Sequence, residues 1–230
     1  VDSPGLLALA RRAGDALSLA GDVASALGVY RRALAFEPSS EELMSRVDEL
    51  LKEQGNAEER VALYRSALEQ GPERERRRQL LHGIGSIERY ELLSPHAAIE
   101  AYQRALADDP NDREAFAALA ALFAETARYA ELCDVLEGSL ETVSPEESRR
   151  LRAQLADVAA AHGQPDRARH HLAVLLADAA LAGVELTVVE RVATTLKDAD
   201  LAEAVLERRL RETPDVREHV DLLERLGTLA

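Results

Sequence analysis

Tryptophan is absent from this chain of 230 residues, and aromatic residues make up only 3% of it. A large aromatic core is therefore excluded. The interior must be built from alanine, leucine and valine, with the few tyrosines and phenylalanines filling the widest gaps. The one cysteine, Cys133, cannot form an internal disulfide. Its neighbours Leu132 and Val135 predict a small, buried and unreactive thiol.

Long hydrophobic runs are also missing. No apolar run approaches the roughly 20 residues that span a bilayer. The first residues, VDSPGLLALARRAGD, lack the charged start and the long apolar centre of a signal peptide. We therefore expect a cytoplasmic location and no membrane partner. Because the chain begins with Val1 instead of methionine, we also expect it to be a piece of a longer protein.

Positive charge is in deficit. The chain has 28 basic and 42 acidic side chains, which gives a net charge of −14. The average surface therefore repels phosphate backbones and anionic lipid headgroups. We expect neither nucleic acid nor membrane as a partner, and the charge favours a basic protein or peptide.

What the chain does have is an internal repeat. The segment 21–38, GDVASALGVYRRALAFEP, returns as the segment 55–72, GNAEERVALYRSALEQGP, and a third copy follows at 98–110. The sequence offset between the first two copies is 34 (55 − 21), which is the length of one stacked helix-turn-helix unit. The recurring landmarks are a tyrosine, an alanine and a proline, namely Tyr30, Ala33 and Pro38, then Tyr64, Ala67 and Pro72, then Tyr102, Ala105 and Pro110.

The first copy resembles the tetratricopeptide repeat. The family pattern has a small residue midway along the first helix, glycine at the turn, and alanine, an aromatic residue, alanine and proline in the second helix. The matching residues here are Gly14, Gly21, Ala26, Tyr30, Ala33 and Pro38. The resemblance covers nearly the whole chain and implies an all-α solenoid, in which about six antiparallel helix pairs and a terminal helix stack into a right-handed superhelix.

We expect one elongated domain, residues 1–230, since each pair in a solenoid packs only on its neighbours. The predicted repeats are 4–38, 41–72, 74–110, 112–143, 145–179 and 184–214, with a final helix at 217–230. Apolar spacing predicts that one second helix covers Val23–Phe36 and that Pro38 stops it. Ser144 and Pro145 predict the cap and first turn of another helix.

Two repeats depart from the pattern. Arg60 stands where the pattern has alanine, and we expect its long stem to loosen the helix pair or to reach water. The third repeat is longer, because Tyr102 stands four places beyond position 98, where an offset of 34 from Tyr64 would end. The four extra residues predict one additional turn in a first helix at 74–92, followed by a second helix at 95–107.

Two groups of side chains have residue types that bind metals. His162, His170 and His171 form the nearest approach to a zinc-binding cluster. Adjacent residues of a helix project about 100° apart, so His170 and His171 are poorly placed to chelate together. We interpret the three as surface or groove histidines. An acidic run lacks the alternating ligands of a calcium loop and is interpreted as charge near the start of the next helix; it consists of Asp108, Asp109 and Asp112.

Catalytic patterns are missing as well. His82 lies near Gly83 and Gly85, but the third glycine and the preceding strand of a dinucleotide-binding loop are absent. No nucleophile lies beside a general base in the sequence. We therefore expect no enzyme activity, no cofactor and no metal.

The densest positive patch lies in the run PERERRR and consists of Arg74, Arg76, Arg77 and Arg78. Arginines at a helix N-terminus oppose the helix dipole and gain nothing from it locally. Two interpretations stay open. One is a solvated helix start, and the other is a patch that binds carboxylate or phosphate groups.

The resemblance also implies a concave groove that is lined by first helices and takes an extended or helical peptide. The residues expected to face it are Arg11, Asp15, Ser45, Glu49, Ala117, Ala121, Ala153, Asp157, Thr187 and Arg191. Chaperone-binding members of the family hold a peptide carboxylate with lysines and asparagines. Lysine occurs here only at positions 52 and 197, so we expect no such clamp.

These observations predict a non-catalytic scaffold that binds a protein segment through its groove or its ends. The first alternative is a regulatory or sensor arm of a larger protein whose active domain lies elsewhere. The second is a helical-repeat RNA-binding module, against which the negative charge and the low aromatic content count. Self-association end to end or through the final helix is a further expectation.

Overall fold

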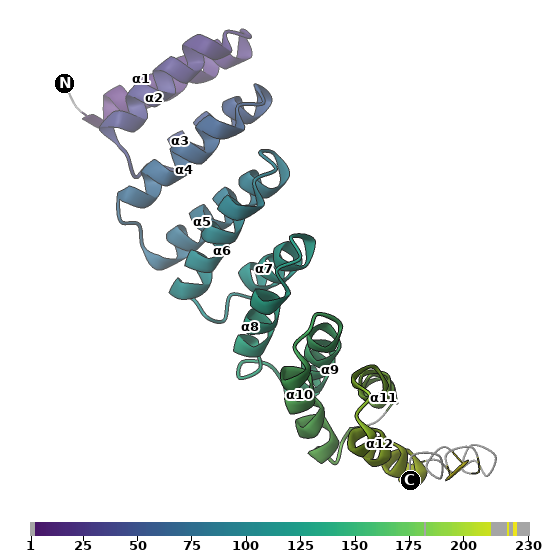
Figure 1. Cartoon of the computed structure of the whole chain (residues 1–230). Coiled ribbons are helices and arrows are strands. Elements are labelled where there is room, and N and C mark those ends of the chain that lie inside the picture. Colours follow the sequence, from purple (N-terminus) through teal and green to yellow (C-terminus); the bar gives the residue numbers. More distant parts are fainter. Residues whose placement is uncertain (1–2, 182, 213–219, 221–222, 225–230) are drawn as a thin grey trace. The chain divides into compact units, whose positions relative to one another are not determined.

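The computed structural model describes residues 3–181, 183–212, 220 and 223–224. This part of the chain contains twelve helices and no strand (Figure 1). The predicted all-α solenoid of stacked helix pairs is therefore confirmed. The handedness of a superhelix stays a prediction.

The helices alternate as first and second members of six pairs. They are α1 (Ser3–Leu19), α2 (Val23–Phe36), α3 (Glu41–Glu53), α4 (Ala57–Glu69), α5 (Arg74–Tyr90), α6 (Pro95–Asp108), α7 (Arg113–Glu125), α8 (Tyr129–Ser139), α9 (Pro145–Ala161), α10 (Pro165–Ala177), α11 (Gly183–Leu196) and α12 (Ala199–Glu212). Most of the predicted final helix, 217–230, lies outside the described residues.

The predicted helix ends hold with small shifts. The helix expected at Val23–Phe36 is confirmed. The long first helix of the third pair ends at Tyr90, two residues before the predicted end, and it keeps the extra turn. Ser144 begins α9 with a capping box, in which Ser144 Oγ accepts from Glu147 N and the Glu147 carboxylate accepts from Ser144 N.

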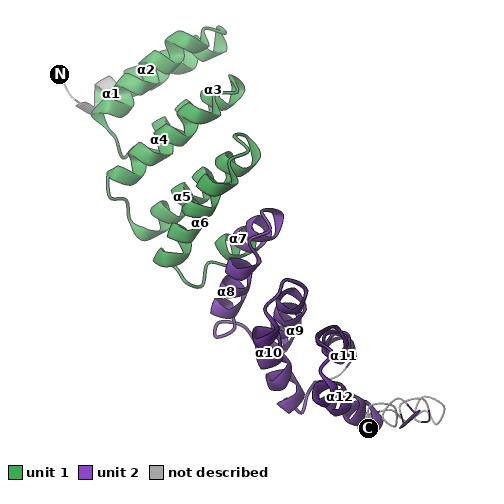
Figure 2. Cartoon of the chain, in the orientation of Figure 1, with its two compact units in different colours: residues 1–118 green, residues 119–230 purple. Residues whose placement is uncertain are grey.

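The chain divides into two compact units, residues 1–118 and residues 119–230 (Figure 2). In unit 1 each of the helices α1 to α5 packs on the next one along the chain, so that the series ends with α5 on α6. In unit 2, α8 packs on α9, α9 packs on both α10 and α11, and α11 packs on α12. The expectation of one continuous domain stays a prediction.

Glycines in first helices make room for tyrosines of second helices. A Cβ atom at Gly14 would lie 2.5 Å from the ring of Tyr30, and one at Gly85 would lie 2.6 Å from the ring of Tyr102. The small residue of the family pattern therefore has a direct steric role here. Gly83 and Gly85, which resembled a fragment of a phosphate-binding loop, belong to this packing.

Arg60 is buried, with 6% of its surface exposed, so the expectation that it reaches water is wrong. Its Nε donates to Asp48 Oδ1 at 2.8 Å and its Nη1 donates to Glu91 Oε1 at 2.5 Å. At the offset of 34 residues, Asp48 corresponds to Gly14 of the first repeat and Arg60 corresponds to Ala26. A charged pair thus fills the crossing that two small residues form in the first pair.

Candidate functional site

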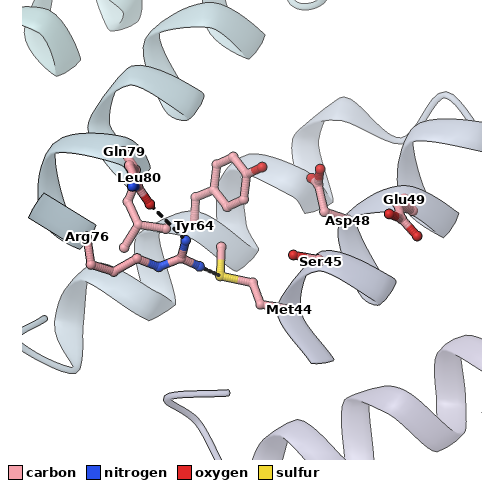
Figure 3. A pocket seen from close by; sticks show the side chains of 8 residues that line it. All are labelled: Met44, Ser45, Asp48, Glu49, Tyr64, Arg76, Gln79 and Leu80. Carbon is pink, nitrogen blue, oxygen red and sulfur yellow. Dashed lines mark hydrogen bonds between the residues drawn. The ribbon is translucent and has the colours of Figure 1, made fainter. Parts of the chain in front are cut away.

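The candidate site is a hollow in unit 1 (Figure 3). It lies on the face that the first helices of this unit form. It encloses about 300 Å³ between α3 and α5, and one residue of α4 closes it. Two of its residues, Ser45 and Glu49, were predicted to line a groove. The full lining is Met44, Ser45, Asp48, Glu49, Tyr64, Arg76, Gln79 and Leu80.

The floor of the hollow is apolar. Met44 of α3 and Leu80 of α5 are 5% and 2% exposed, and both line the hollow. Met44 also borders two neighbouring hollows of unit 1, of about 250 and 330 Å³. It is the one methionine of the chain. Its unbranched thioether adapts to irregular gaps, so this floor can adjust to the shape of a bound side chain.

Arg76 spans the hollow from α5 to α3. Its Nη2 donates to Met44 Sδ at 3.1 Å, its Nη1 donates to Gln79 Oε1 at 3.3 Å, and its Nε lies 3.3 Å from Glu41 Oε1. The guanidinium is therefore held across the two first helices by residues of the chain itself.

Tyr64 presents a neutral hydroxyl to the hollow. Burial raises the pKa of Tyr64, and the negative charge and hydrogen bond of Asp48 raise it further. The phenol therefore stays protonated at physiological pH. Asp48 is at the same time the ion-pair partner of Arg60. The inner wall of the hollow is thus a satisfied polar network that fixes the tyrosine ring.

A second polar network continues along the same face to α1. Tyr30 Oη donates to Asp15 Oδ1 at 2.6 Å. Burial and then this carboxylate raise the pKa of Tyr30 to about 12. Arg46 lies between two carboxylates, with Nε 3.7 Å from Asp15 and Nη1 3.4 Å from Glu49. The predicted groove residues Asp15 and Glu49 therefore share one arginine.

Arg11 also lies on this part of unit 1. Its Nη1 is 3.0 Å from Glu42 Oε2 and its Nη2 is 3.7 Å from Glu37 Oε2. The contact links α1 to the beginning of α3. The structure thus brings four predicted groove residues, Arg11, Asp15, Ser45 and Glu49, onto neighbouring first helices.

The arginine cluster at the start of α5 makes ion pairs within the chain. Arg77 Nε lies 2.8 Å from Asp108 Oδ2, and Arg74 Nη2 lies 3.1 Å from Asp109 Oδ1 and donates to the carbonyl of Asp108 at 3.0 Å. Arg78 pairs with Glu75 on its own helix. The interpretation as a merely solvated helix start missed these pairs, which fasten α5 to the C-terminal end of α6. A role in partner binding stays a prediction.

Of the remaining predicted groove residues, Ala117 is exposed at the end of unit 1 and Ala121 is half-buried at the start of unit 2, both on α7. The others lie in unit 2. Arg191 Nη2 lies 3.1 Å from Asp157 Oδ1, which joins α11 to α9. Arg209 Nη2 donates to Thr187 Oγ1 at 3.1 Å. Ala153 is 4% exposed, so the expectation that it faces a groove is wrong. The reason is that α9 packs on both α10 and α11, which covers more of its surface than a solvent-lined groove helix would have.

One of the three clustered histidines is buried, and sequence reasoning missed it. His171 is 2% exposed, and its Nε2 lies 2.9 Å from Glu137 Oε1. Burial lowers the pKa of His171. His162 and His170 are exposed, as predicted, and the ring of His162 stacks on Tyr129 with 3.3 Å between the ring centroids.

Glu137 joins α8 to α10 through a second partner. Arg167 donates to its two carboxylate oxygens at 2.6 Å each and to Asp134 Oδ1 at 2.5 Å. The Arg167 guanidinium, and then His171, hold the pKa of Glu137 at about 2. Cys133 on the same helix is fully buried, as predicted, and burial raises the pKa of its thiol. This cluster is a structural ion-pair network.

The acidic run lies at the start of α7, as predicted, and one of its residues also caps that helix. Asp112 Oδ1 accepts from the backbone N–H groups of Glu114 and Ala115, and its Oδ2 lies 2.6 Å from His82 Nε2. Over the residues that the structure describes, no group of three metal-ligating side chains converges. Over the same residues, every helix is too short or too polar to cross a bilayer.

Comparison with known proteins adds evidence on the fold. No protein-family model and no curated protein matches this sequence. Among solved structures, the complex described as Naa15/Naa10 bound to HypK-THB matches with a TM-score of 0.55 and 18% identity, over 93% of this chain and 32% of the matched chain. This chain therefore spans about a third of the length of that protein.

Two further solved structures are similar at a lower level. A TPR repeats protein (BF2334) from Bacteroides fragilis matches over 100% of this chain and 99% of its own, with 10% identity and a TM-score of 0.49. YrrB, described as a TPR protein with an unusual peptide-binding site, matches over 82% of this chain and 86% of its own, with 18% identity and a TM-score of 0.43. The match with a TM-score of 0.55 supports the fold of stacked helix pairs.

Proposed function

We propose that this tetratricopeptide-like chain is a non-catalytic scaffold that binds a peptide or protein segment along the first-helix face of unit 1, in the hollow of Figure 3. The observation that carries the proposal is the composition of that hollow. An apolar floor of Met44 and Leu80 lies beneath a rim of hydrogen-bonding side chains, and this combination is typical of sites that anchor a side chain and a backbone together.

The rim offers both neutral hydrogen-bonding groups and a charged group. Ser45, Glu49 and Gln79 are exposed and lie at the mouth of the hollow. The amide and hydroxyl can pair with peptide backbone groups, and the Glu49 carboxylate attracts a lysine or arginine of the ligand. Arg76 and Asp48 are held by partners within the chain, so they present a fixed surface that needs no reorganisation on binding.

A protein partner is consistent with the comparison. The solved structure with a TM-score of 0.55 is described as a complex bound to HypK-THB, so that protein of similar fold assembles with other chains. We extend this only to the class of partner, a protein or peptide, and its preferred basic character follows from the net charge of −14. The expected location is the cytoplasm. A regulatory arm of a larger protein remains the alternative prediction, which the flanking sequence decides.

Selection of random peptides on the immobilised chain tests the proposal. We expect the enriched peptides to share an apolar residue flanked by lysine or arginine, and the dissociation constant to rise with ionic strength. Glu49→Arg should weaken binding by about tenfold, because it replaces attraction by repulsion at the rim. Glu100→Arg is the matched control, since Glu100 is an exposed carboxylate on the second helix α6.

Two results would contradict the proposal. One is a selection that yields no shared sequence. The other is equal binding of the selected peptides to the Glu49 and Glu100 variants, which would place the binding surface elsewhere. A dissociation constant that is independent of salt would contradict the basic character of the partner. It would not contradict binding in the hollow.

A further inference from the structure

The hollow of Figure 3 adjoins a second hollow in unit 1, which we call the edge hollow. The edge hollow encloses about 330 Å³ and is lined by the connections that join α2 to α3 and α4 to α5. Three residues line both hollows, namely Met44, Arg76 and Leu80. The two hollows therefore share an apolar floor, and the binding surface continues past the hollow of Figure 3 to these connections.

Helix α3 carries a row of three polar side chains along both hollows. Glu41, Ser45 and Glu49 follow one another at intervals of four residues, so they lie on one face of the helix. All three are exposed. Glu41 lines the edge hollow, whereas Ser45 and Glu49 line the hollow of Figure 3. The row therefore places a carboxylate at each end of the combined surface and a hydroxyl between them, next to the buried Met44.

Each end of this row carries an excess of negative charge. In the edge hollow, Arg76 pairs with Glu41 at 3.3 Å, and the exposed Glu73 carboxylate makes neither a cap hydrogen bond nor an ion pair with the residues that the structure describes. At the other end, Arg46 is shared between Glu49 and a carboxylate of α1. Each end can therefore accept one cation from a ligand.

The distance between the two ends selects the shape of the ligand. Positions that are eight residues apart in a helix, as Glu41 and Glu49 are, lie about 12 Å apart along its axis. An extended peptide rises by about 3.3 Å per residue, so two of its residues that are four apart span about 13 Å. Its side chains alternate between two faces, and those at positions i, i+2 and i+4 therefore point to the same side. A helical ligand would need eight residues for the same span.

We infer that the ligand of this surface is an extended segment in which one basic residue stands two places before an apolar residue and another stands two places after it. The apolar side chain enters the shared floor of Met44 and Leu80. One cation pairs with Glu49, and the other pairs with Glu73 in the edge hollow. This inference rests on the proposed function, because it specifies the ligand of the same site.

Designed peptides of one composition test the spacing. The matched peptide contains the sequence KSLSK between neutral flanks, and two controls contain the same residues in the orders KLSSK and KSLKS. All three peptides carry the same charge, so their nonspecific attraction to the acidic chain is equal. We expect the matched peptide to bind the chain about tenfold more tightly than either control, because only this order directs the leucine and both lysines to one side. Fluorescence anisotropy of labelled peptides measures the dissociation constants.

A double variant tests whether the two ends are recognised separately. Glu49→Gln and Glu73→Gln together should weaken binding of the matched peptide about tenfold, because both ion pairs are lost. The same variant should weaken binding of a peptide with only one lysine, KSLSQ, about threefold. The control variant replaces Glu58 and Glu100 by glutamine. Both are exposed carboxylates of second helices that line neither hollow, so the control removes the same charge and should change neither affinity.

Three results would overturn the inference. The first is equal affinity for the three peptides of one composition. The second is tighter binding of a helical peptide with lysines eight residues apart, which would indicate a helical ligand. The third is an equal loss for the two-lysine and one-lysine peptides in the double variant, which would mean that only one lysine is recognised. The proposed function survives each of these results as long as randomly selected peptides bind in the hollow of Figure 3, and its own failure is the absence of such peptides.

Discussion

The ring of Tyr64 lies on the backbone of Gly83, so closely that a Cβ atom at position 83 would be 2.5 Å from the ring. Tyr64 belongs to the second helix α4 and Gly83 to the next first helix, α5. This contact joins one helix pair to the following pair. In contrast, Gly14 admits the tyrosine of its own pair. The same residue type therefore serves both the packing within a pair and the stacking between pairs.

Gly83→Ala should destabilise unit 1. The added methyl group must displace the Tyr64 ring or separate α4 from α5, and we expect the free energy of unfolding to fall by about 1–2 kcal/mol after the gain in helix propensity is counted. Gly28→Ala is the matched control, because nothing lies within 4 Å of a Cβ atom there and Gly28 is inside α2. The control should gain about 0.5–1 kcal/mol. Urea unfolding of the two variants measures both values, and a stabilised Gly83→Ala would show that the tyrosine yields without cost.

The turn between α5 and α6 stores backbone strain at Leu93. Its φ of 52° is left-handed, whereas the corresponding turn between α1 and α2 has Gly21 with a φ of 80°. Leu93 is 77% exposed and contributes little packing. Leu93→Gly should therefore stabilise the chain, by about 0.5–1 kcal/mol in the free energy of unfolding, even though glycine loosens the unfolded state.

A reciprocal change checks the interpretation of Leu93. Gly163 has a φ of 76° in the turn between α9 and α10, and nothing lies within 4 Å of a Cβ atom there. Gly163→Ala should cost about 1 kcal/mol through backbone strain alone. If Leu93→Gly lowers the melting temperature while Gly163→Ala leaves it unchanged, backbone strain is not what distinguishes these turns.

The helix positions could be predicted from the sequence, but the side-chain networks between the helices could not. The second helix Val23–Phe36 follows from apolar spacing and from Pro38, both of which are local signals. The exchange of Gly14 and Ala26 for Asp48 and Arg60 was not recognised. Each substitution alone looks like a departure from the pattern, and only the structure shows that they compensate each other.

The burial of His171 was missed for a similar reason. Its carboxylate partner Glu137 stands 34 residues earlier, on the second helix α8 of the preceding pair. Helical projection correctly separates His170 from His171, but it treats a helix as isolated and so cannot show which of the two faces a neighbour. A search for opposite charges at the repeat period would have found this pair.

The Glu137 network should make unit 2 sensitive to acid. The pKa of Glu137 falls from 4.5 to about 2 on folding, so the unfolded chain takes up this proton first as the pH drops. The stabilisation is present above pH 4.5 and is lost as the pH falls towards 2. Glu137→Gln should flatten the decline of the unfolding free energy across this window. Glu141→Gln, at an exposed carboxylate in the following turn, should keep the slope of the parent chain, and equal slopes for all three proteins would contradict the role of Glu137.

The Arg60–Asp48 pair can be tested by substituting the residues that stand at the equivalent positions of the first repeat. Arg60→Ala leaves the mostly buried Asp48 carboxylate without its partner, and we expect a loss of about 3 kcal/mol in the free energy of unfolding. Adding Asp48→Gly recreates the alanine and glycine of the first pair and removes the unpaired charge. The double variant should therefore be more stable than Arg60→Ala alone, with a coupling energy of about 1–3 kcal/mol in a double-mutant cycle. Additive losses would mean that Asp48 is solvated without Arg60, and that the charged crossing is no substitute for the small one.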